Sequence, residues 1–461
     1  VDIFFVISGY VITASLAKRN AENPKEFLLG FFERRIKRIL PALAFFVVIC
    51  SLLICLVNPE AHLTIKTGIT SLFGLSNLYL IRSATDYFAP ETNLRVFVHT
   101  WSLAVEEQFY FIFPFLILLT GFQKNKLKSL SKLFYFILFL SIISFILFFY
   151  FNKNDPLSAY FLMPCRFWEI SSGCLLFLLI RLKNNFKTNL EKIPSLLVLF
   201  LMLIIMTQQK IGMVLGTTSI VILTSFLIGG IKTKSNSFKL LSNKLFVSIG
   251  LLSYSLYLWH WGILSLSRWT IGIHPWSIPI QIVLILLFSI FSYKYIEVPI
   301  RKNKWSLKKS LNIFFGLMIS IISTAILLPF SNTKYQGFLY IGNKERLNNW
   351  GKKSLQRGEW AKATCSYSAN ANNPLPREEN FKRCWYGWPD HKNKEEFDKI
   401  SVLERFDHQL MTSSLKTHHT LKPDFSWACS DINDIKKKYE LKNYILLFPF
   451  CSPHLTIKKW P

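Results

Sequence analysis

Residues 132–151 read KLFYFILFLSIISFILFFYF, and this stretch decides the fold class. Apart from the lysine at its start and two serines, every residue is apolar or aromatic, so a helix drawn through it is apolar on all sides. About 20 such residues are enough to cross the hydrocarbon layer of a bilayer as a helix. A buried helix of a soluble protein is rarely so long and so uniformly apolar. The stretch therefore predicts a membrane-spanning helix.

The rest of the chain has the same character. Of its 461 residues, 51% are hydrophobic and 42 are Phe. Ten apolar blocks are expected to span the membrane: 1–17, 39–57, 101–120, 132–151, 160–181, 194–207, 211–230, 247–267, 277–296 and 311–330. The predicted fold is an all-α polytopic membrane helical bundle. Because the chain begins at Val1 within an apolar block and shows no signal peptide, we expect a fragment whose true beginning is missing.

The basic residues predict the orientation. Alternate connections carry 24 Lys and Arg (18–38, 121–132, 181–193, 231–245 and 301–309), and the remaining connections carry six (58–100, 152–159, 208–210 and 268–276). The positive-inside rule places the first set in the cytoplasm. The net charge of +27 is therefore explained by topology. In the absence of a binding motif, nucleic acid is not an expected partner, whereas membrane lipids are.

This orientation holds only if the block 67–82 (TGITSLFGLSNLYLIR) does not cross the membrane. We expect it to form a re-entrant or interfacial helix on the outer side. Gly68, Gly74 and Asn77 suit an irregular backbone that is shielded by protein.

Residues 331–461 then form a second domain outside the cytoplasm, after a membrane domain at 1–330. This region is polar, and we expect it to be small and α/β-like or partly disordered. Its four cysteines suit disulfides in an oxidising compartment, with Cys365–Cys384 the preferred pair and four free thiols the alternative. The cysteines within spans are expected to be packing residues: Cys50, Cys55, Cys165 and Cys174.

Three arginines precede the second span in FFERRIKRILP: Arg34, Arg35 and Arg38. Arg35 and Arg38 are three residues apart and share a helix face. Two guanidinium groups side by side can hold a phosphate or diphosphate through charge-assisted hydrogen bonds. The alternative is an ordinary positive anchor that only orients the span.

Two adjacent acids lie within an apolar block in HTWSLAVEEQFYFIFP. Glu106 and Glu107 point about 100° apart on a helix, so at least one must face the interior of the bundle. A carboxyl group there can act as an acid or base, or can orient a histidine. The alternative is a salt bridge to Arg166. His99 lies at the membrane interface near the start of the same block.

Two other spans carry polar groups in their outer halves. YFLMPCRFWEISSG places Arg166 and Glu169 three residues apart, which predicts an ion pair on one helix face. SYSLYLWHW places Tyr257 and His260 in the same relation. His260 is a candidate base or proton donor near a carbohydrate-like hydroxyl, with aromatic rings beside it to stack on the sugar. The alternative is that it belongs to the aromatic belt.

The motifs VDIFFVISGYVI, FFERRIKRILP, HTWSLAVEEQFYFIFP, CRFWEISSG, SYSLYLWHW and YIEVPIRK, in this order, resemble the membrane acyltransferase 3 family. The layout is most similar to its bacterial O-antigen acetylase-like branch, in which an extracytoplasmic SGNH-type domain follows the last span. The resemblance covers about residues 1–330. The segments HTWSLAVEEQFY and R-R-x-x-R are the most specific.

The resemblance implies an acyltransferase that transfers groups other than amino-acyl groups. It implies a multi-pass protein of the bacterial inner membrane that moves an acyl group, usually acetyl from acetyl-CoA, to a hydroxyl of an extracytoplasmic glycan or lipid-linked oligosaccharide. O-acetylation of lipopolysaccharide O-antigen in the cell envelope is one such reaction. Arg35 and Arg38 match the motif that engages the CoA donor, Glu106 and Glu107 the acidic pair, and His260 the outer histidine. No metal is expected.

The chain departs from the family pattern in two places. The family has a helix before VDIFF that carries a histidine proposed as the catalytic base, and this sequence starts after it. The tail contains no G-D-S nucleophile segment, and KISVLERFDHQL occupies roughly its expected place. We therefore expect a truncated, degenerate or frame-shifted SGNH-like domain without hydrolase or esterase chemistry of its own.

The favoured mechanism is direct attack of a sugar hydroxyl on the thioester carbonyl after a base removes its proton. A relay through an acyl-enzyme ranks lower, because no membrane Ser or Cys lies beside a clear base in the sequence. Two other readings stay open. Buried Glu, Arg and His also mark the substrate path of a transporter or flippase, and the chain could be an inactive fragment.

Overall fold

The computed structural model describes residues 1–17, 23–83, 90–121, 127–208, 212–232, 235–303, 305–306, 308–332 and 337–342. They belong to one compact unit, Val1–Gly342, and within these ranges the regular elements are all helices. The predicted all-α helical bundle is confirmed for this part. Asn343–Pro461 forms a second unit. The expected SGNH-like domain, its Cys365–Cys384 pair and the segment 399–410 lie outside the described residues.

Each expected span corresponds to a helix or to a run of joined helices. In chain order these are α1 (Asp2–Ala17), α2 (Pro24–Val57), α5 (Trp101–Thr120), α6 (Leu127–Asn154), α7 and α8 (Pro156–Phe161 and Met163–Leu182), α10 (Ser195–Thr207), α11 (Met213–Gly230), α13 (Lys244–Trp269), α14, η4 and α15 (Ile278–Phe291, Ser292–Glu297 and Val298–Lys302), and α16 (Lys309–Leu327). Seven helices of the described part are long and apolar enough to cross a membrane, and α1 and α10 are shorter apolar helices.

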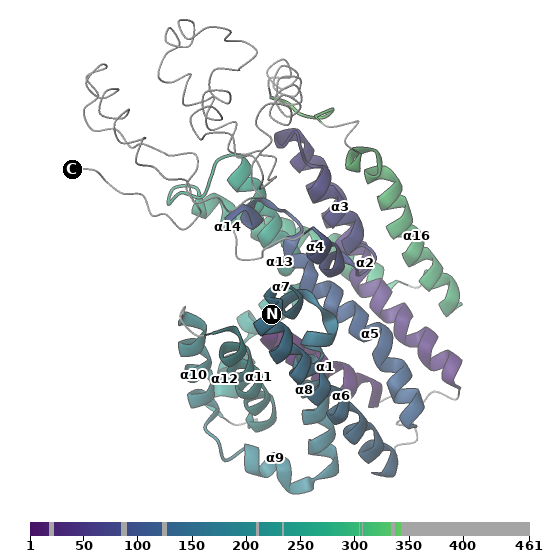
Figure 1. Cartoon of the computed structure of the whole chain (residues 1–461), viewed down its shortest axis with the longest axis vertical. Helices are drawn as coiled ribbons and strands as arrows, with labels where there is room; N and C mark the ends of the chain where they lie inside the picture. The colour runs from purple at the N-terminus through teal and green to yellow at the C-terminus, as the bar shows by residue number, and fades with distance from the viewer. Residues whose placement is uncertain are drawn as a thin grey trace, which may run out of the picture. The chain divides into compact units, whose positions relative to one another are not determined.

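Short elements connect these helices. They are α3 (His62–Ser71), α4 (Ser76–Arg82), η1 (Pro90–Leu94), η2 (Val98–Thr100), α9 (Asn184–Leu190), α12 (Asn236–Leu241) and η5 (Pro329–Ser331). In Figure 1, α2 and α16 run side by side along one flank of the bundle, and α10, α11 and α12 gather at another.

The block 67–82 is broken into two short helices, as its glycines suggested. α3 ends at Ser71 and α4 begins at Ser76. Gly74 between them has φ of +66°, a left-handed conformation that glycine adopts without steric cost. Neither helix is long enough to cross a bilayer, which needs about 20 residues. The break agrees with the expected irregular backbone.

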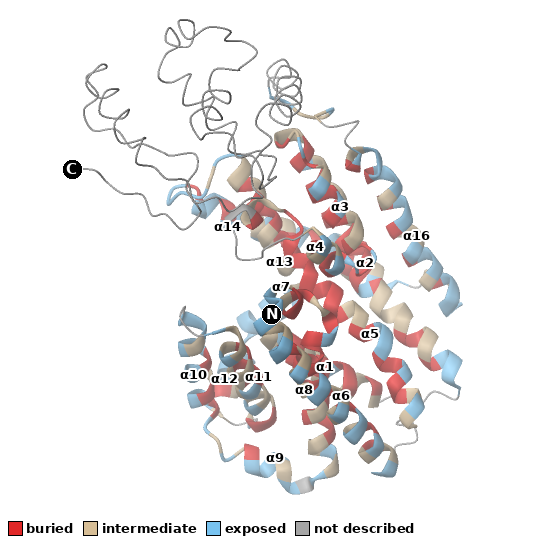
Figure 2. Ribbon diagram, viewed as in Figure 1, coloured by how far each residue is buried: buried red, intermediate tan, exposed pale blue. Residues whose placement is uncertain are grey.

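The interior is close-packed where α1 crosses α8. A Cβ atom on Gly9 would overlap the carbonyl oxygen of Ile170, and one on Gly173 would overlap the carbonyl oxygen of Val6. The two backbones can approach this closely only because both residues lack a side chain, which is how membrane helices commonly pack. Figure 2 shows the buried residues concentrated at such crossings in the middle of the bundle.

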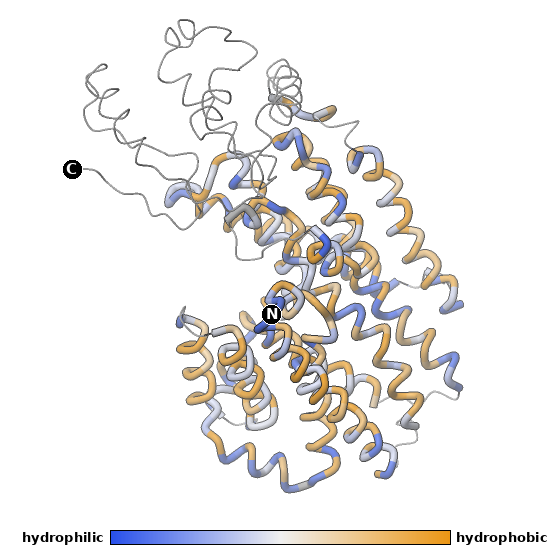
Figure 3. Tube along the Cα trace, in the orientation of Figure 1, coloured by the Kyte–Doolittle hydropathy of each residue, from blue (hydrophilic) through white to orange (hydrophobic). Residues whose placement is uncertain are grey.

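The outer faces of the bundle are apolar, as a bilayer requires. Figure 3 shows hydrophobic residues continuing along the outer helices. Large side chains such as Phe139 and Phe149 on α6 are about three-fifths exposed. An apolar surface of this extent is unfavourable in contact with water. This is a membrane protein. Its cysteines within spans are buried and unpaired, which confirms that they are packing residues: Cys50, Cys55, Cys165 and Cys174.

The helix that carries the arginine cluster is unusually long. α2 has 34 residues, or roughly 50 Å at 1.5 Å per residue, against a hydrocarbon layer of about 30 Å. Its start is fixed by Asn23, whose side chain accepts a 2.8 Å bond from the N–H of Glu26, and by Pro24 at the first helical position. The arginines therefore lie on a helix that continues into the bundle, with Arg38 three residues before the internal Pro41.

Candidate active site

The arginine cluster faces the helix that carries the two acids. The guanidinium carbon of Arg35 on α2 lies 4.4 Å from the ring centre of Tyr110 on α5. The Tyr110 hydroxyl donates a hydrogen bond to the carboxylate of Glu106, one turn earlier on the same helix. Glu106 is 3% exposed. The structure thus joins a cation from α2 to a phenol and a carboxyl group from α5.

Groups from three more elements complete this inner cluster. The hydroxyl of Ser8 on α1 interacts with the Glu106 carboxyl group, and Arg35 and Arg38 lie within electrostatic range of it. Arg38 is also in range of Tyr254 on α13 and of Glu297 on η4. We call this set the inner cluster: Ser8, Arg35, Arg38, Glu106, Tyr110, Tyr254 and Glu297.

Ser8 and Tyr110 were not selected from the sequence. Tyr110 follows Glu106 by four residues, a spacing that puts both on one helix face and could have indicated the contact. Ser8 lies within the apolar motif VDIFFVISGYVI. Its hydroxyl lies near the Glu106 carboxyl group, a contact between helices that the sequence does not indicate.

Glu107 points away from the arginines. Its carboxyl oxygen lies 2.6 Å from the point where a Cβ atom on Gly74 would stand. The next residue, Gln108, donates 2.9 Å and 2.8 Å bonds to the Gly74 carbonyl and to Oδ1 of Asn77. The adjacent acids diverge as helix geometry predicts. Glu106 belongs to the inner cluster, and Glu107 packs against the turn between α3 and α4.

Neither acid pairs with Arg166, so that alternative is wrong. Nη1 of Arg166 lies 2.6 Å from Oε1 of Glu169, as predicted from their spacing on α8, and 4.0 Å from Oδ1 of Asp2. Arg166 and Glu169 are 2% and 0% exposed. Nε of Arg166 donates a 3.1 Å bond to the Tyr160 carbonyl. Glu297, at the other end of the bundle, pairs with Arg301 at 3.3 Å.

A second cluster gathers two histidines and a tyrosine between η2 and α13. The ring centre of His99 lies 5.1 Å from that of Tyr257 and 5.8 Å from that of His260. The Tyr257 hydroxyl donates to the backbone carbonyl of His99 and lies 2.9 Å from Oγ of Ser102. We call His99, Ser102, Tyr257 and His260 the outer cluster. The structure brings together the two histidines that were selected separately from the sequence.

The two imidazoles differ in their hydrogen bonding. Nδ1 of His260 lies 3.0 Å from the carbonyl oxygen of Leu256, one turn earlier. This contact requires a proton on Nδ1, so the lone pair of a neutral His260 is on Nε2. His99 is 5% exposed, and in the described part of the chain neither of its buried ring nitrogens makes a hydrogen bond of normal geometry, although backbone groups of Val96 and Leu258 lie near them. A buried imidazole without a well-formed hydrogen bond is a candidate to bind a ligand or to take part in a reaction.

The same two helices support both clusters. His99 immediately precedes α5, and Glu106 follows it by seven residues, a rise of about 10 Å along a helix. On α13, Tyr254 is in range of Arg38, and Tyr257 and His260 follow within two turns. The clusters are therefore stacked along the helix axes. The arginines of the inner cluster and the imidazoles of the outer cluster thus lie at different depths along the helices. Two ligands that enter from opposite ends, one charged and one neutral, would each meet one cluster.

Within the part of the chain that is described, no group of three or more His, Cys, Asp or Glu side chains is arranged to hold a metal ion.

Comparison with known proteins gives a consistent assignment. The model of the family described as "Acyltransferase domain" matches residues 1–294. The O-acetyltransferase OatA of Staphylococcus aureus strain NCTC 8325 / PS 47 is 33% identical over 321 residues, which is 66% of this chain and 52% of the relative. OatA of strain COL matches to the same extent. The chain thus spans about half the length of the curated relatives it matches. No solved structure matches it.

Proposed function

Because this chain belongs to the acyltransferase family that its residues 1–294 match, we propose that it is a membrane O-acetyltransferase. Its donor is acetyl-CoA and its acceptor is a hydroxyl group of a glycan outside the cytoplasm, such as O-antigen, another cell-surface polysaccharide or a lipid-linked oligosaccharide. The observation that carries the proposal is the pair of stacked clusters on α5 and α13. The relatives are named O-acetyltransferases, which supports the same reaction class.

The donor would bind through the arginines of α2. CoA carries a diphosphate and a ribose phosphate, and a planar guanidinium binds phosphate oxygens with two parallel hydrogen bonds. Arg35 and Arg38 supply the charges, and Arg34 extends the cationic surface by one residue. By the positive-inside rule this end of α2 would face the cytoplasm, on the side from which a CoA thioester would bind. The guanidinium of Arg35 packs over the Tyr110 ring, and the hydrogen bond from Tyr110 to Glu106 fixes that ring. These two contacts would hold Arg35 in place.

The acceptor would be activated at the outer cluster. A neutral imidazole, His99 or His260, removes the proton of the sugar hydroxyl as its oxygen attacks the acetyl carbonyl carbon. The C–S bond of the thioester then breaks, and the proton passes to the departing thiolate. The products are the O-acetyl ester and free CoA. Tyr257 would orient the cluster, since its hydroxyl ties the backbone of His99 to α13.

A two-step transfer is a second route that one observation favours. Ser8 lies near Glu106, so this carboxylate would accept the serine proton while the hydroxyl oxygen attacks the acetyl carbonyl carbon of the donor. The C–S bond then breaks, and the proton passes to the departing CoA thiolate. The resulting Ser8 ester would then be attacked by the sugar hydroxyl. Ser8→Ala separates the two routes, because it abolishes transfer only in the relay.

The proposal is tested with the purified protein in lipid nanodiscs, by measuring CoA release with a thiol reagent and acetylation of an N-acetylglucosamine tetrasaccharide by mass spectrometry. Arg35→Ala and Arg38→Ala should raise KM for acetyl-CoA at least tenfold, since each loses a charge-assisted contact. His99→Ala and His260→Ala should lower kcat by 10²-fold or more. Arg181→Gln, a cation at the end of α8, is the matched control. Uptake of the tetrasaccharide into sealed proteoliposomes without CoA release would assign the chain to the transporter class instead.

A further inference from the structure

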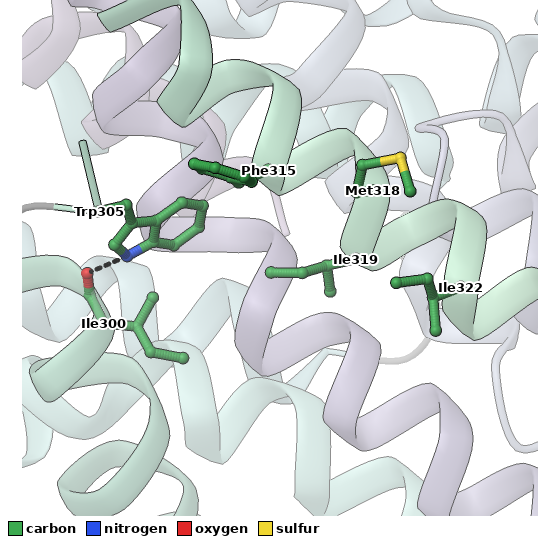
Figure 4. A pocket seen from close by; sticks show the side chains of 6 residues that line it. All are labelled: Ile300, Trp305, Phe315, Met318, Ile319 and Ile322. Carbon is green, nitrogen blue, oxygen red and sulfur yellow. Dashed lines mark hydrogen bonds between the residues drawn. The ribbon is translucent and has the colours of Figure 1, made fainter. Parts of the chain in front are cut away.

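A groove at the corner between α15 and α16 points to a second binding function. Its volume is about 410 Å³, and it is lined by Ile300, Trp305, Phe315, Met318, Ile319 and Ile322. Four of these residues lie on α16 at spacings of three, four and seven, so they form one helix face. Figure 4 shows that face with the indole of Trp305 and the side chain of Ile300 across from it. The groove belongs to neither cluster of the candidate active site.

The groove opens toward the bilayer. On α16, the side that meets the bundle carries Asn312, Gly316 and Ser320, all buried. Phe315 and Ile322 on the groove side are 43% and 52% exposed. In a helix that is apolar enough to cross a membrane, an exposed apolar face contacts lipid tails. The groove runs along this face for about 10 Å, the rise of seven helical residues, which suits an acyl chain lying along the helix.

Trp305 is fixed as the wall of the groove. Its indole N–H donates a 3.0 Å hydrogen bond to the carbonyl oxygen of Ile300. The ammonium nitrogen of Lys37 on α2 forms a cation–π contact with Trp305, 5.5 Å from its ring centre. A tryptophan with one polar edge bonded and one apolar face open is typical of the interface between headgroups and tails.

Positive charge gathers at one end of the groove only. Lys302 lies between Ile300 and Trp305 in the sequence, and Lys308 stands just before α16, seven residues before Phe315. Both are exposed. Neither forms an ion pair with a carboxylate of the described residues, whereas Arg301 is paired with Glu297. Lys309 instead faces α2, with Nζ 4.0 Å from the Cβ position of Gly30. The far end, at Ile322, is followed by uncharged residues for the rest of α16.

We propose that this groove binds one anionic phospholipid, with an acyl chain along α16 and the headgroup phosphate at Lys302 and Lys308. Each basic residue near a membrane surface favours anionic lipid by about fivefold. Phosphatidylcholine has the same tails and a similar phosphate but no net charge. The site should therefore discriminate between headgroups, which ordinary lipid contact along an apolar helix does not do. The bound lipid would contact the same indole on which Lys37 rests, close to the arginines of α2.

The test uses tryptophan quenching by lipids with brominated tails. The purified protein is placed in nanodiscs that contain increasing fractions of dibrominated phosphatidylglycerol or dibrominated phosphatidylcholine, with unlabelled phosphatidylcholine as the remainder. The difference between the natural protein and Trp305→Phe isolates the signal of Trp305 from those of the other tryptophans. We expect half-quenching of this signal at a mole fraction at least fivefold lower for phosphatidylglycerol.

The lysines provide the decisive variants. Lys302→Gln/Lys308→Gln should abolish the headgroup preference, and the matched control Lys183→Gln/Lys187→Gln around α9 should keep it. Native mass spectrometry supplies a second readout that does not need Trp305: the natural protein should retain one phosphatidylglycerol more often than the lysine variant. Equal quenching by both lipids, or a preference that survives the lysine substitutions, would mean lipid contact without a site and would overturn the proposal.

Discussion

The side-chain amide of Asn312 on α16 donates a 2.7 Å hydrogen bond to Oε1 of Glu33 on α2. Lys37 donates a 3.0 Å bond to the same carboxylate oxygen. Ile36 and Leu40 continue this side of α2 and contact the position of Gly316 on α16. Because residues 33, 36, 37 and 40 share one helix face, the contact with α16 fixes the rotation of α2 about its axis. Arg35 and Arg38 are thereby held toward α5.

Asn312→Leu should weaken donor binding without removing any group from the active site. Loss of one interhelical hydrogen bond costs about 1 kcal/mol in a membrane protein. It also removes a contact that fixes the rotation of α2, so Arg35 and Arg38 are held toward α5 less firmly. We expect KM for acetyl-CoA to rise several-fold, kcat to stay unchanged, and the thermal unfolding temperature to fall slightly. Ile321→Leu, on the exposed side of α16, is the control. An unchanged KM together with a lower unfolding temperature would limit the role of Asn312 to stability.

Removing one partner of the ion pair between Arg166 and Glu169 should destabilise the protein more than replacing both partners. Arg166→Leu leaves the fully buried carboxylate of Glu169 without its cation, and removing one partner of such a pair costs about 3–5 kcal/mol. The double variant Arg166→Leu/Glu169→Leu removes both charges and should recover most of that loss. Thermal unfolding in detergent checks both. A double variant no more stable than Arg166→Leu would show that the guanidinium is required for its contacts to Tyr160 and not for charge balance.

Gly173→Ala should disrupt the crossing of α1 and α8. The added methyl group would overlap the carbonyl oxygen of Val6, so the helices must separate and lose contact along their length. Overpacking of this kind costs about 1–3 kcal/mol. Gly250→Ala on α13 is the matched control, because nothing lies within 4 Å of its Cβ position. It should be neutral or stabilising, since alanine favours the helix by up to about 1 kcal/mol over glycine. Equal unfolding temperatures for the two variants would contradict the close crossing.

The helices and their order could be predicted because the bilayer imposes a length and a polarity on each span. All ten apolar blocks became helices, and the break at Gly74 followed from residues that tolerate irregular backbone. The ion pair of Arg166 with Glu169 was also predictable, because its partners are three residues apart on one helix. These are local relations, in which helix periodicity fixes which side chains meet.

The clusters could be predicted only in part, because they depend on contacts between helices. Periodicity showed that Glu106 and Glu107 diverge, but not which one faces Arg35. The position of Ser8 beside Glu106 depends on how α1 crosses the bundle, which its glycines allow but do not specify. The contact of Asn312 with Glu33 joins residues 279 apart, and neither motif indicates the other. The catalytic and donor-binding roles of the selected residues stay predictions.

Asp155 should make the stability of the α6–α8 region depend on pH. It caps α7: Oδ1 accepts a 3.2 Å bond from the N–H of Ser158. Hydrogen bonds from the hydroxyl and the N–H of Ser158 lower the pKa of Asp155 below its usual value. A carboxyl group with a lowered folded-state pKa stabilises the fold fully above its unfolded pKa of about 3.9, and this contribution is lost as pH falls through the folded-state pKa.

Two substitutions separate the charge of Asp155 from its capping bond. Asp155→Ala removes both and should cost about 1 kcal/mol at pH 7. Asp155→Asn keeps an acceptor oxygen at the cap but cannot titrate, so it should lose only the part due to charge at the helix N-terminus, a few tenths of a kcal/mol. The difference in unfolding temperature between the natural protein and Asp155→Asn should therefore shrink below about pH 4. A difference that stays constant from pH 7 to pH 2 would show that the carboxylate charge contributes nothing to the fold.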